Sequence, residues 1–399
     1  MKTIYKTILV TIISLVLIGI LAYFIWPKTA NQDSVTENVD NVIEPMENVQ
    51  MNLESKMDKS ELYGNYYDEA TQLVSEMTLE EKTSQMFLAR HPDVRAENEV
   101  KENQPGGYIL FGRDFEKETI NSITQKIEKY QELSKTKMFI GVDEEGGSVV
   151  RVSGHKQFRS EKFKSPQVLY EEGGLERVLQ DSHEKTELLK SLGINLNLAP
   201  VVDVTTNKDS FIYDRTLGQS AEVTGEYAKA VVKAMNQDKM ISALKHFPGY
   251  GDNVDTHTGI ATDEREYSNF EECDFLPFIS GIKEGAPMIL VNHNIVKCMD
   301  ENMPASLSKN VHDILREKLG FSGLIITDDL AMDAVKSYVE NGQAAVQAVI
   351  AGNDMIISSD FENQKKEIVD AVNNGQIQEE LITKASTRII ACKLAYDLI

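Results

Sequence analysis

The sequence has few cysteines and few basic residues for its length. Among 399 residues there are 3 cysteines, which leave one over from any pairing and show no metal-ligand spacing. The sequence therefore predicts neither a disulfide framework nor a structural zinc site. Lysine and arginine together number 41 against 63 aspartates and glutamates, a formal net charge of −22. This balance argues against nucleic-acid binding and against a polybasic membrane patch.

Phosphate-binding loops are also missing from the sequence. It contains no G-x-G-x-x-G and no G-x-x-x-x-G-K-[ST] motif, so nothing supports a dinucleotide or nucleotide cofactor. A zinc enzyme is an alternative, because His246, His257 and His293 with Asp255 are suitable ligand types. No pair of them has the spacing of H-E-x-x-H, however, and the sequence favours a site without metal.

One long hydrophobic run occurs, at the amino terminus. Lys2 and Lys6 precede an uncharged stretch from Thr7 to Trp26, about the 20 residues that cross a bilayer as a helix. No small-residue cleavage site follows it, so residues 1–28 are predicted to be a single-pass transmembrane anchor, with a cleaved secretory signal as the alternative. The positive-inside rule places the rest outside the cytoplasm. Residues 29–60 are polar and lack aromatics, which predicts a flexible linker.

Residues 61–399 alternate between short apolar runs and amphipathic stretches. Helices are predicted after the capping-box pattern at Thr78, from Thr119 to Leu133 and from Gly225 to Asn236. Eight strands alternating with helices favour an α/β fold, a single catalytic (β/α)8 barrel of the TIM type, over a doubly wound sheet. The eight runs are M-F-L-A at Met86, Y-I-L-F at Tyr108, M-F-I-G-V at Met138, I-N-L-N-L-A at Ile194, S-A-L-K at Ser242, M-I-L-V at Met288, L-I-I-T at Leu324 and M-I-I-S at Met355.

Polar residues fall where these predicted strands end. Barrel enzymes build their sites at the carboxyl ends of the strands, so this position is typical of catalytic and binding residues. Following the second to the seventh run, these residues are Arg113, Asp143 and Glu144, Asp203, Lys245 and His246, His293, and Asp328 and Asp329.

The stretch from Lys245 to Gly259 holds the densest group of titratable residues. Its proline and glycines forbid a continuous helix, which predicts a polar loop after the fifth strand. In Asp255-Thr256-His257 a turn would let the carboxylate hydrogen-bond one imidazole nitrogen, which fixes the tautomer and raises the basicity of the other nitrogen. The alternative is a surface loop with an incidental histidine.

The seventh run delivers Asp328 into the barrel mouth, whereas Asp329 points elsewhere because neighbours on a strand alternate faces. A retaining glycosidase needs a carboxylate that attacks the anomeric carbon and, opposite it, a group that donates a proton to the leaving oxygen. Asp328 and His257 could fill these two roles. The alternative for Asp328 is a helix N-cap before Leu330. Asp143 would accept bonds from sugar hydroxyls, with the neighbouring glycines permitting close backbone approach, or lie in a simple turn.

Three basic groups, Arg215, Lys245 and His246, would donate to the oxygens of a sugar ring. Their alternatives are internal salt bridges that hold the loops, and for Asp214-Arg215 the alternative is a surface ion pair. The residues alone leave these possibilities open.

Taken together and in order, these motifs resemble the family-3 glycoside hydrolases, and more narrowly the bacterial β-N-acetylglucosaminidases that trim peptidoglycan fragments. The resemblance spans roughly Tyr63 to Ile399. It rests on M-T-L-E-E-K at Met77, G-G-Y-I-L-F at Gly106, V-D-E-E-G-G at Val142, A-P-V-V-D-V at Ala199, K-H-F-P-G at Lys245, D-T-H at Asp255, I-T-D-D-L-A-M at Ile326 and A-G-N-D-M-I at Ala351.

The resemblance implies roles for individual residues. Asp328 is the expected nucleophile, His257 the acid/base and Asp255 its partner, with Thr256 where the subgroup has serine. Tyr250 and Ser148 depart from the family pattern, at positions where a histidine and an arginine are common. The expected sugar-binding groups are Asp143, Arg151, Arg215, Lys245 and His246.

The resemblance also implies an activity. We expect a membrane-tethered, monomeric, cofactor-free exo-β-N-acetylglucosaminidase that acts on cell-wall saccharides outside the cytoplasm. The alternatives are a β-glucosidase, β-xylosidase or phosphorylase of the same fold, and a non-catalytic wall-binding protein.

Overall fold

The computed structural model describes residues 58–253, 261–332, 335 and 343–399. Residues Lys56–Ile399 belong to one compact unit. The predicted anchor, nearly all of the predicted linker, Asp255 and His257 lie outside the described residues, so these predictions are not tested. None of the helices within the described ranges is long and apolar enough to span a bilayer.

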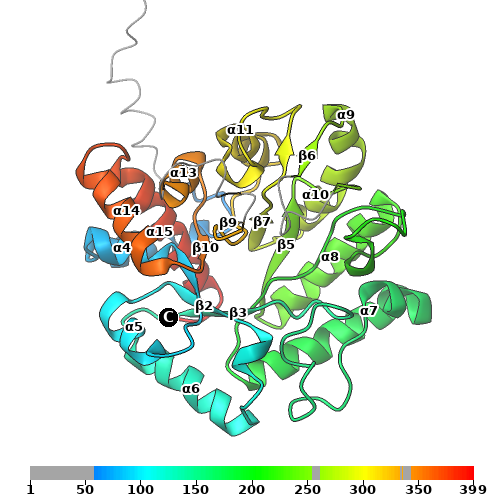
Figure 1. Cartoon of the computed structure of the whole chain (residues 1–399), viewed down its shortest axis with the longest axis horizontal. Coiled ribbons are helices and arrows are strands. Elements are labelled where there is room, and N and C mark those ends of the chain that lie inside the picture. The colour runs from blue at the N-terminus through cyan, green and yellow to red at the C-terminus, as the bar shows by residue number, and fades with distance from the viewer. Residues whose placement is uncertain (1–57, 254–260, 333–334, 336–342) are drawn as a thin grey trace, which may run out of the picture. The chain divides into compact units, whose positions relative to one another are not determined.

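Eight parallel strands form a nearly closed barrel at the centre of this unit (Figure 1). Their order is β10-β1-β2-β3-β4-β5-β7-β9, and the bridge between Ile326 and Met355 joins the two ends of the sheet. Each predicted apolar run contributes one strand, so the predicted barrel is confirmed. The strands are β1 (Phe87–Arg90), β2 (Gly107–Leu110), β3 (Phe139–Val142), β4 (Leu196–Asn197), β5 (Ile241–Phe247), β7 (Met288–Val291), β9 (Leu324–Thr327) and β10 (Ile356–Ser358).

Helices surround the barrel and cover the strands, which are buried over nearly their whole length. The longest, α7, is kinked at Gly173 and Gly174. A small parallel pair, β6 (Thr262–Asp263) with β8 (Ile295–Val296), lies outside the barrel sheet. The main helices are α3 (Tyr67–Ser75), α4 (Leu79–Gln85), α5 (Ala96–Asn103), α6 (Ile120–Leu133), α7 (Pro166–Ser191), α8 (Ala221–Gln237), α9 (Tyr267–Asn269), α10 (Phe275–Lys283), α11 (Lys309–Asp313), α13 (Ala344–Ala351), α14 (Phe361–Asn373) and α15 (Glu379–Ala395).

Local sequence signals explain where these helices begin. Thr78 accepts a hydrogen bond from the backbone N–H of Glu81, and the Glu81 carboxylate accepts one from the Thr78 N–H, as the capping-box pattern predicts. In α6 the buried residues Ile123, Ile127 and Tyr130 recur every three or four positions. They turn one face of the helix toward the barrel.

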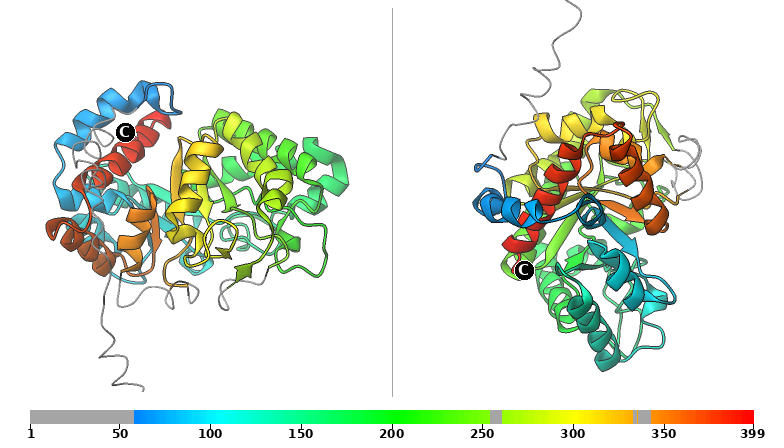
Figure 2. Two further views of the ribbon diagram at one scale, coloured as in Figure 1. Left: turned by 90° about the horizontal axis from the view of Figure 1, so that it is seen from above. Right: turned by 90° about the vertical axis from the view of Figure 1, so that its left-hand side faces the viewer.

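The last helix, α15, packs against α3 and α4, which come from the other end of the described chain (Figure 2). It carries Lys393, a fully buried lysine beside the amino-terminal ends of the strands. Its Nζ donates to Gln85 Oε1 at 2.7 Å and to Gly106 O at 3.0 Å, and lies 4.9 Å from the ring centroid of Phe139. Burial lowers the pKa of Lys393 to about 7.

This buried amine predicts how stability depends on pH. Between pH about 7 and pH about 10.5 the unfolded chain holds a proton on Lys393 that the folded chain has lost, so stability rises with pH across this window. We expect the free energy of unfolding of the wild type, relative to Lys393→Met, to rise by roughly 1 kcal/mol per pH unit there. Urea unfolding at two pH values measures it. The exposed Lys366→Met is the control, and a difference independent of pH would contradict a neutral buried amine.

Candidate active site

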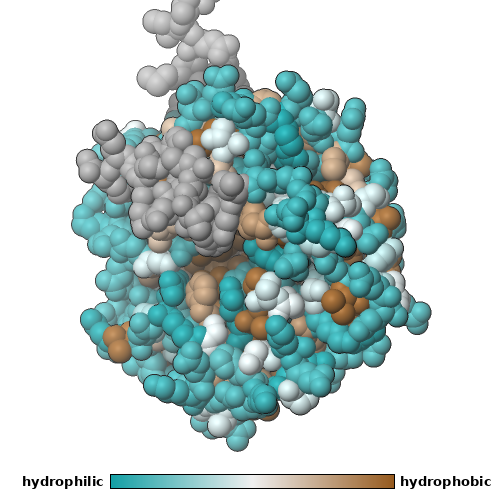
Figure 3. Space-filling view, turned by 45° about the vertical axis from the view of Figure 1, so that its right-hand side comes forward, coloured by the Kyte–Doolittle hydropathy of each residue, from teal (hydrophilic) through white to brown (hydrophobic). Residues whose placement is uncertain are grey.

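A cavity of about 360 Å³ opens at the carboxyl ends of the barrel strands. It collects side chains from β1, β2, β5, β7 and β10 and from the segments that follow β2, β3, β4 and β9. All six candidate site residues that the structure describes contribute to its lining: Asp143, Arg151, Arg215, Lys245, His246 and Asp328. On the face drawn in Figure 3 the surface is mostly hydrophilic, with hydrophobic residues in small groups.

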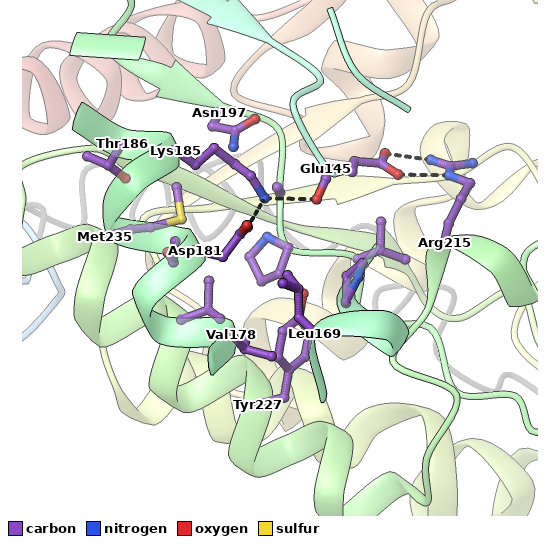
Figure 4. Close-up of a pocket in the computed structure, with 16 residues that line it drawn as sticks. Glu145, Leu169, Val178, Asp181, Lys185, Thr186, Asn197, Arg215, Tyr227 and Met235 are labelled. Carbon is purple, nitrogen blue, oxygen red and sulfur yellow. Dashed lines mark hydrogen bonds and ion pairs between the residues drawn. The ribbon is translucent and has the colours of Figure 1, made fainter. Parts of the chain in front are cut away.

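Four of the lining residues form one charge network, in which Lys245 and Glu145 are buried. Lys245 Nζ lies 2.8 Å from Asp143 Oδ1 and 2.6 Å from Glu145 Oε1. Arg215 binds Glu145 through two bonds, Nε to Oε2 at 3.0 Å and Nη2 to Oε1 at 2.8 Å (Figure 4). The Glu145 carboxylate is therefore shared between two cations, and it fixes both of them relative to Asp143.

The pKa shifts of Glu145 and Arg215 both favour the charged forms of these two groups. Burial alone would raise the pKa of Glu145, but Lys245 and Arg215 hold it well below its usual range. Burial would lower the pKa of Arg215, and Glu145 raises it instead. Behind Glu145, Lys185 of α7 donates to the Glu145 carbonyl oxygen at 2.9 Å and lies 3.2 Å from Asp181 Oδ2 (Figure 4). Glu145 is thus anchored through its backbone as well.

His246 is held by two partners of opposite kind. Its Nδ1 lies 2.7 Å from Asp203 Oδ2, and its Nε2 lies 3.1 Å from Arg215 Nη2. Because a guanidinium can only donate, Nε2 is the acceptor and the proton of a neutral imidazole is on Nδ1. Both ring nitrogens are therefore engaged by the protein, which makes His246 a poor general acid.

A local irregularity lets two adjacent residues of β5 face the same cavity. The register of β5 against β7 shifts between Lys245 and Phe247, so the strict alternation of side chains is interrupted there. Asp203 fixes the position of this end of β5. Its carboxylate also accepts hydrogen bonds from the backbone N–H of His246 at 3.1 Å and of Tyr250 at 2.8 Å.

The neighbouring carboxylates Glu144 and Glu145 serve different purposes. Glu144 is fully buried and accepts hydrogen bonds from the backbone N–H groups of Arg151, Val152 and Ser153 and from the Ser153 hydroxyl. It organises the loop after β3. The glycines of this loop also serve the protein itself: a Cβ on Gly146, which has a φ of +107°, would lie 2.2 Å from Lys164 O. The expectation that they admit close approach to a sugar is not supported by this packing.

Asp328 and Asp329 follow β9. The Asp328 backbone N–H donates to Val291 O at 3.0 Å, and its Oδ1 accepts from the Asp329 N–H at 2.9 Å. Asp329 also contributes to the lining, but its carboxylate accepts from the Ala331 N–H at 2.9 Å and from Ser359 Oγ at 2.5 Å. Its oxygens serve the turn, so Asp328 is the better candidate for chemistry.

A family model for the glycosyl hydrolase family 3 N-terminal domain matches residues 78–392. The chain belongs to glycosyl hydrolase family 3. The resemblance drawn from the motifs is thereby confirmed.

Two relatives and one solved structure are similar to this chain. A β-hexosaminidase of Nitrosomonas eutropha is 32% identical over 63% of this chain and 73% of its own length. β-Hexosaminidase A of Pseudoalteromonas piscicida is 29% identical over 72% of this chain, which spans about half (53%) of that protein. The structure of a family-3 β-N-acetylglucosaminidase from Paenibacillus sp. aligns with a TM-score of 0.75 at 28% identity, covering 81% of this chain and 63% of the other.

Some residues that the sequence suggested for the site do not line the cavity, and one suggested ion pair does not form. Arg113 turns away to His91 O at 2.9 Å and to Asp93 Oδ1 at 2.5 Å. His293 is buried between Ser306 Oγ and Asp329 O. The suggested Asp214–Arg215 surface pair is wrong, because Arg215 turns inward to Glu145.

Other family-3 site features were missed from the sequence. The role of Glu145 was not foreseen, although it stands in the V-D-E-E-G-G motif. Asp203 was noted only for its place after the fourth strand, and Arg90 and Phe111 of the lining were not singled out at all. No group of histidines, cysteines and carboxylates able to hold a metal ion occurs among the described residues.

Proposed function

We propose that this family-3 protein is a retaining exo-β-N-acetylglucosaminidase that removes terminal β-GlcNAc from cell-wall saccharides. The observation that carries the proposal is the presence of Asp328 in one cavity with the Asp143–Lys245–Glu145–Arg215 network. The names of the similar proteins, β-hexosaminidase and β-N-acetylglucosaminidase, supply the sugar.

The cavity suits an enzyme that holds the end of a chain. Its volume of about 360 Å³ is near the lower end of the range for small-molecule sites, so it has room for a terminal sugar rather than for a long chain crossing it. Asp143 would accept bonds from sugar hydroxyls, while Lys245 and Arg215 donate to them. Because Glu145 fixes these cations in advance, little ordering is needed when the sugar binds.

The reaction would take place in two displacements. Asp328 attacks the anomeric carbon, the bond to the leaving oxygen breaks, and His257 gives its proton to that oxygen. Water then attacks the same carbon, His257 takes a proton from it, and Asp328 leaves as a carboxylate. The roles of His257 and its partner Asp255 rest on the D-T-H motif, because both lie outside the described residues.

Aryl glycosides test the proposed sugar and reaction. Purified protein is assayed with nitrophenyl β-glycosides of GlcNAc, glucose and xylose, each with and without inorganic phosphate. We expect the highest kcat/KM on the GlcNAc glycoside, with free GlcNAc as the product in both conditions. A preference for glucose or xylose would reject the proposed sugar, release of a sugar 1-phosphate would reject hydrolysis, and no turnover on any glycoside would favour a wall-binding protein.

We also propose that residues 1–28 anchor the enzyme in the membrane with the catalytic domain on the outer side. The full-length protein should then occur in membrane fractions, and protease added to intact cells should release a fragment by cutting between residues 29 and 60. A mature protein that begins after Trp26 and is found in the medium would favour the cleaved signal instead.

A further inference from the structure

Arg90 differs from every other arginine of the chain in its partners. All arginines lie within the described residues, and each of the others has a carboxylate within 4.0 Å. No carboxylate in the described chain pairs with Arg90, although it stands at the end of β1 and lines the candidate active-site cavity. In a protein with 63 acidic side chains, an unpaired guanidinium at this place needs a reason.

Phe111 orients the Arg90 side chain. The Arg90 Cζ lies 4.7 Å from the ring centroid of Phe111, in a cation–π contact. Such a contact occupies the face of the guanidinium and leaves the N–H groups at its edge for hydrogen bonds. The Nε of Arg90 is shielded from solvent and has no hydrogen-bond partner in the described structure. The group is therefore held in place with donors unused.

A second guanidinium lies near the same ring. The Arg151 Cζ is 5.6 Å from the Phe111 centroid, and the Arg151 Nε is likewise shielded and unbonded. Arg151 Nη2 is 3.5 Å from Asp143 Oδ2, but that carboxylate already binds Lys245 at 2.8 Å. Asp143 is thus shared between Lys245 and Arg151, and its ion pair with Arg151 is the longer of the two. Arg90 and Arg151 therefore both keep N–H donors that an anion bound between them would accept.

The position of these residues indicates which part of a substrate they meet. Arg90, Phe111 and Arg151 are partly exposed, whereas Lys245 and Glu145 are buried. If the inner network holds the terminal sugar, the outer residues face the leaving group or the solution.

We propose that Arg90, oriented by Phe111 and assisted by Arg151, binds an oxyanion in the outer part of the cavity. The oxyanion is a carboxylate on the leaving group of the substrate or inorganic phosphate from solution. This inference rests on the proposed function for its account of the leaving group, and adds to it a preference for an acidic substrate set by Arg90.

Two measurements distinguish the sources. The first compares kcat/KM for two GlcNAc β-glycosides, whose aglycones are 4-(carboxymethyl)phenol and its methyl ester. The methylene group insulates the phenol oxygen from the charge, so the two leaving groups differ little in acidity. We expect the wild type to prefer the acid and Arg90→Met to lose that preference by about tenfold, the worth of a charge-assisted hydrogen bond. The second measures phosphate binding by calorimetry, which needs no turnover.

Matched variants exclude effects of net charge and folding. Arg113→Met removes the same charge from an arginine that follows β2 but pairs with Asp93 outside the cavity. Arg90→Lys keeps the charge without the planar donors, so its preference should lie between wild type and Arg90→Met even if the latter is destabilised. Thermal unfolding reports the folding of each variant.

Each result decides the proposal. Loss of the acid preference in Arg90→Met but not in Arg113→Met assigns the site to a substrate carboxylate. If Arg90→Met loses phosphate binding but keeps the acid preference, and Arg113→Met keeps both, the same site is assigned to phosphate. If wild type shows neither preference nor phosphate binding, or Arg90→Met matches Arg113→Met in both measurements, the oxyanion site is wrong. Wild type that binds phosphate but cleaves no GlcNAc glycoside would retain the site and reject the proposed function.

Discussion

The Asp328→Ala variant should fold normally and lose turnover of an aryl β-GlcNAc glycoside by a factor of about 10³ or more, roughly 4 kcal/mol of barrier. Asp328 follows β9 and lines the cavity, whereas the oxygens of Asp329 bind the Ala331 N–H and the Ser359 hydroxyl. With Asp328 removed, no covalent glycosyl intermediate could form at this position. Single-turnover and steady-state kinetics with a thermal unfolding control measure the effect.

Two further results separate a nucleophile from a merely structural carboxylate. Azide added to Asp328→Ala should restore release of the phenol, because the small anion attacks the anomeric carbon from the face that the carboxylate has vacated. The product is then the α-glycosyl azide. Asp329→Ala should lose far less activity and gain nothing from azide. If Asp328→Ala keeps more than a few per cent of the wild-type kcat, a loss of roughly 2 kcal/mol or less, the assignment is wrong.

The barrel could be predicted from the sequence because its strands are short and mostly apolar. Parallel strands covered by helices read as continuous hydrophobic runs, and the eight runs beginning near Met86 and ending near Met355 became the eight strands. The helix starts at Thr78 and Thr119 were predictable because their caps are local. Strand order and closure depend on contacts between distant residues, such as Ile326 with Met355, and the count alone could not show them.

The site was predictable in location but not in its pairing. Asp143, Lys245 and Asp328 were placed by the rule that barrel sites lie at carboxyl ends of strands. The rule does not distinguish Glu144 from Glu145, which are adjacent and identical, yet one binds backbone N–H groups and the other binds Arg215 and Lys245. Their roles depend on which face of the loop each one occupies, and only the fold determines it.

Arg90 could not be singled out from the sequence for a different reason. It follows the apolar run of the first strand, where a single arginine carries no signal of its own. Its interest comes from the absence of a carboxylate partner in the described chain and from the Phe111 ring at 4.7 Å, which are properties of the assembled barrel.

The structure narrows the search for the general acid. His246 has Asp203 on one ring nitrogen and Arg215 on the other, and the Glu144 carboxylate is taken by the loop that it organises. Glu145 is ionised between two cations, which hold its pKa well below the range of a proton donor at neutral pH. These exclusions strengthen the hypothesis that the acid is His257, which the D-T-H motif predicts.

Replacing His257 with alanine should reduce turnover most for substrates with poor leaving groups. A histidine that protonates the leaving oxygen matters greatly for a sugar alcohol and little for a nitrophenolate, which departs without much protonation. For His257→Ala we expect a large loss of kcat on a GlcNAc disaccharide and a smaller loss of kcat/KM on an activated aryl glycoside.

Water must still be deprotonated when the intermediate is hydrolysed, so a burst of phenol should precede slow turnover in His257→Ala. Asp255→Ala should behave as a milder version, because the imidazole remains but has lost the partner that orients it. Equal losses of kcat/KM on both substrates would mean that His257 only shapes its loop. The acid would then have to be sought at Asp143, because the Glu144 carboxylate accepts backbone hydrogen bonds within its loop and Glu145 is held ionised between two cations.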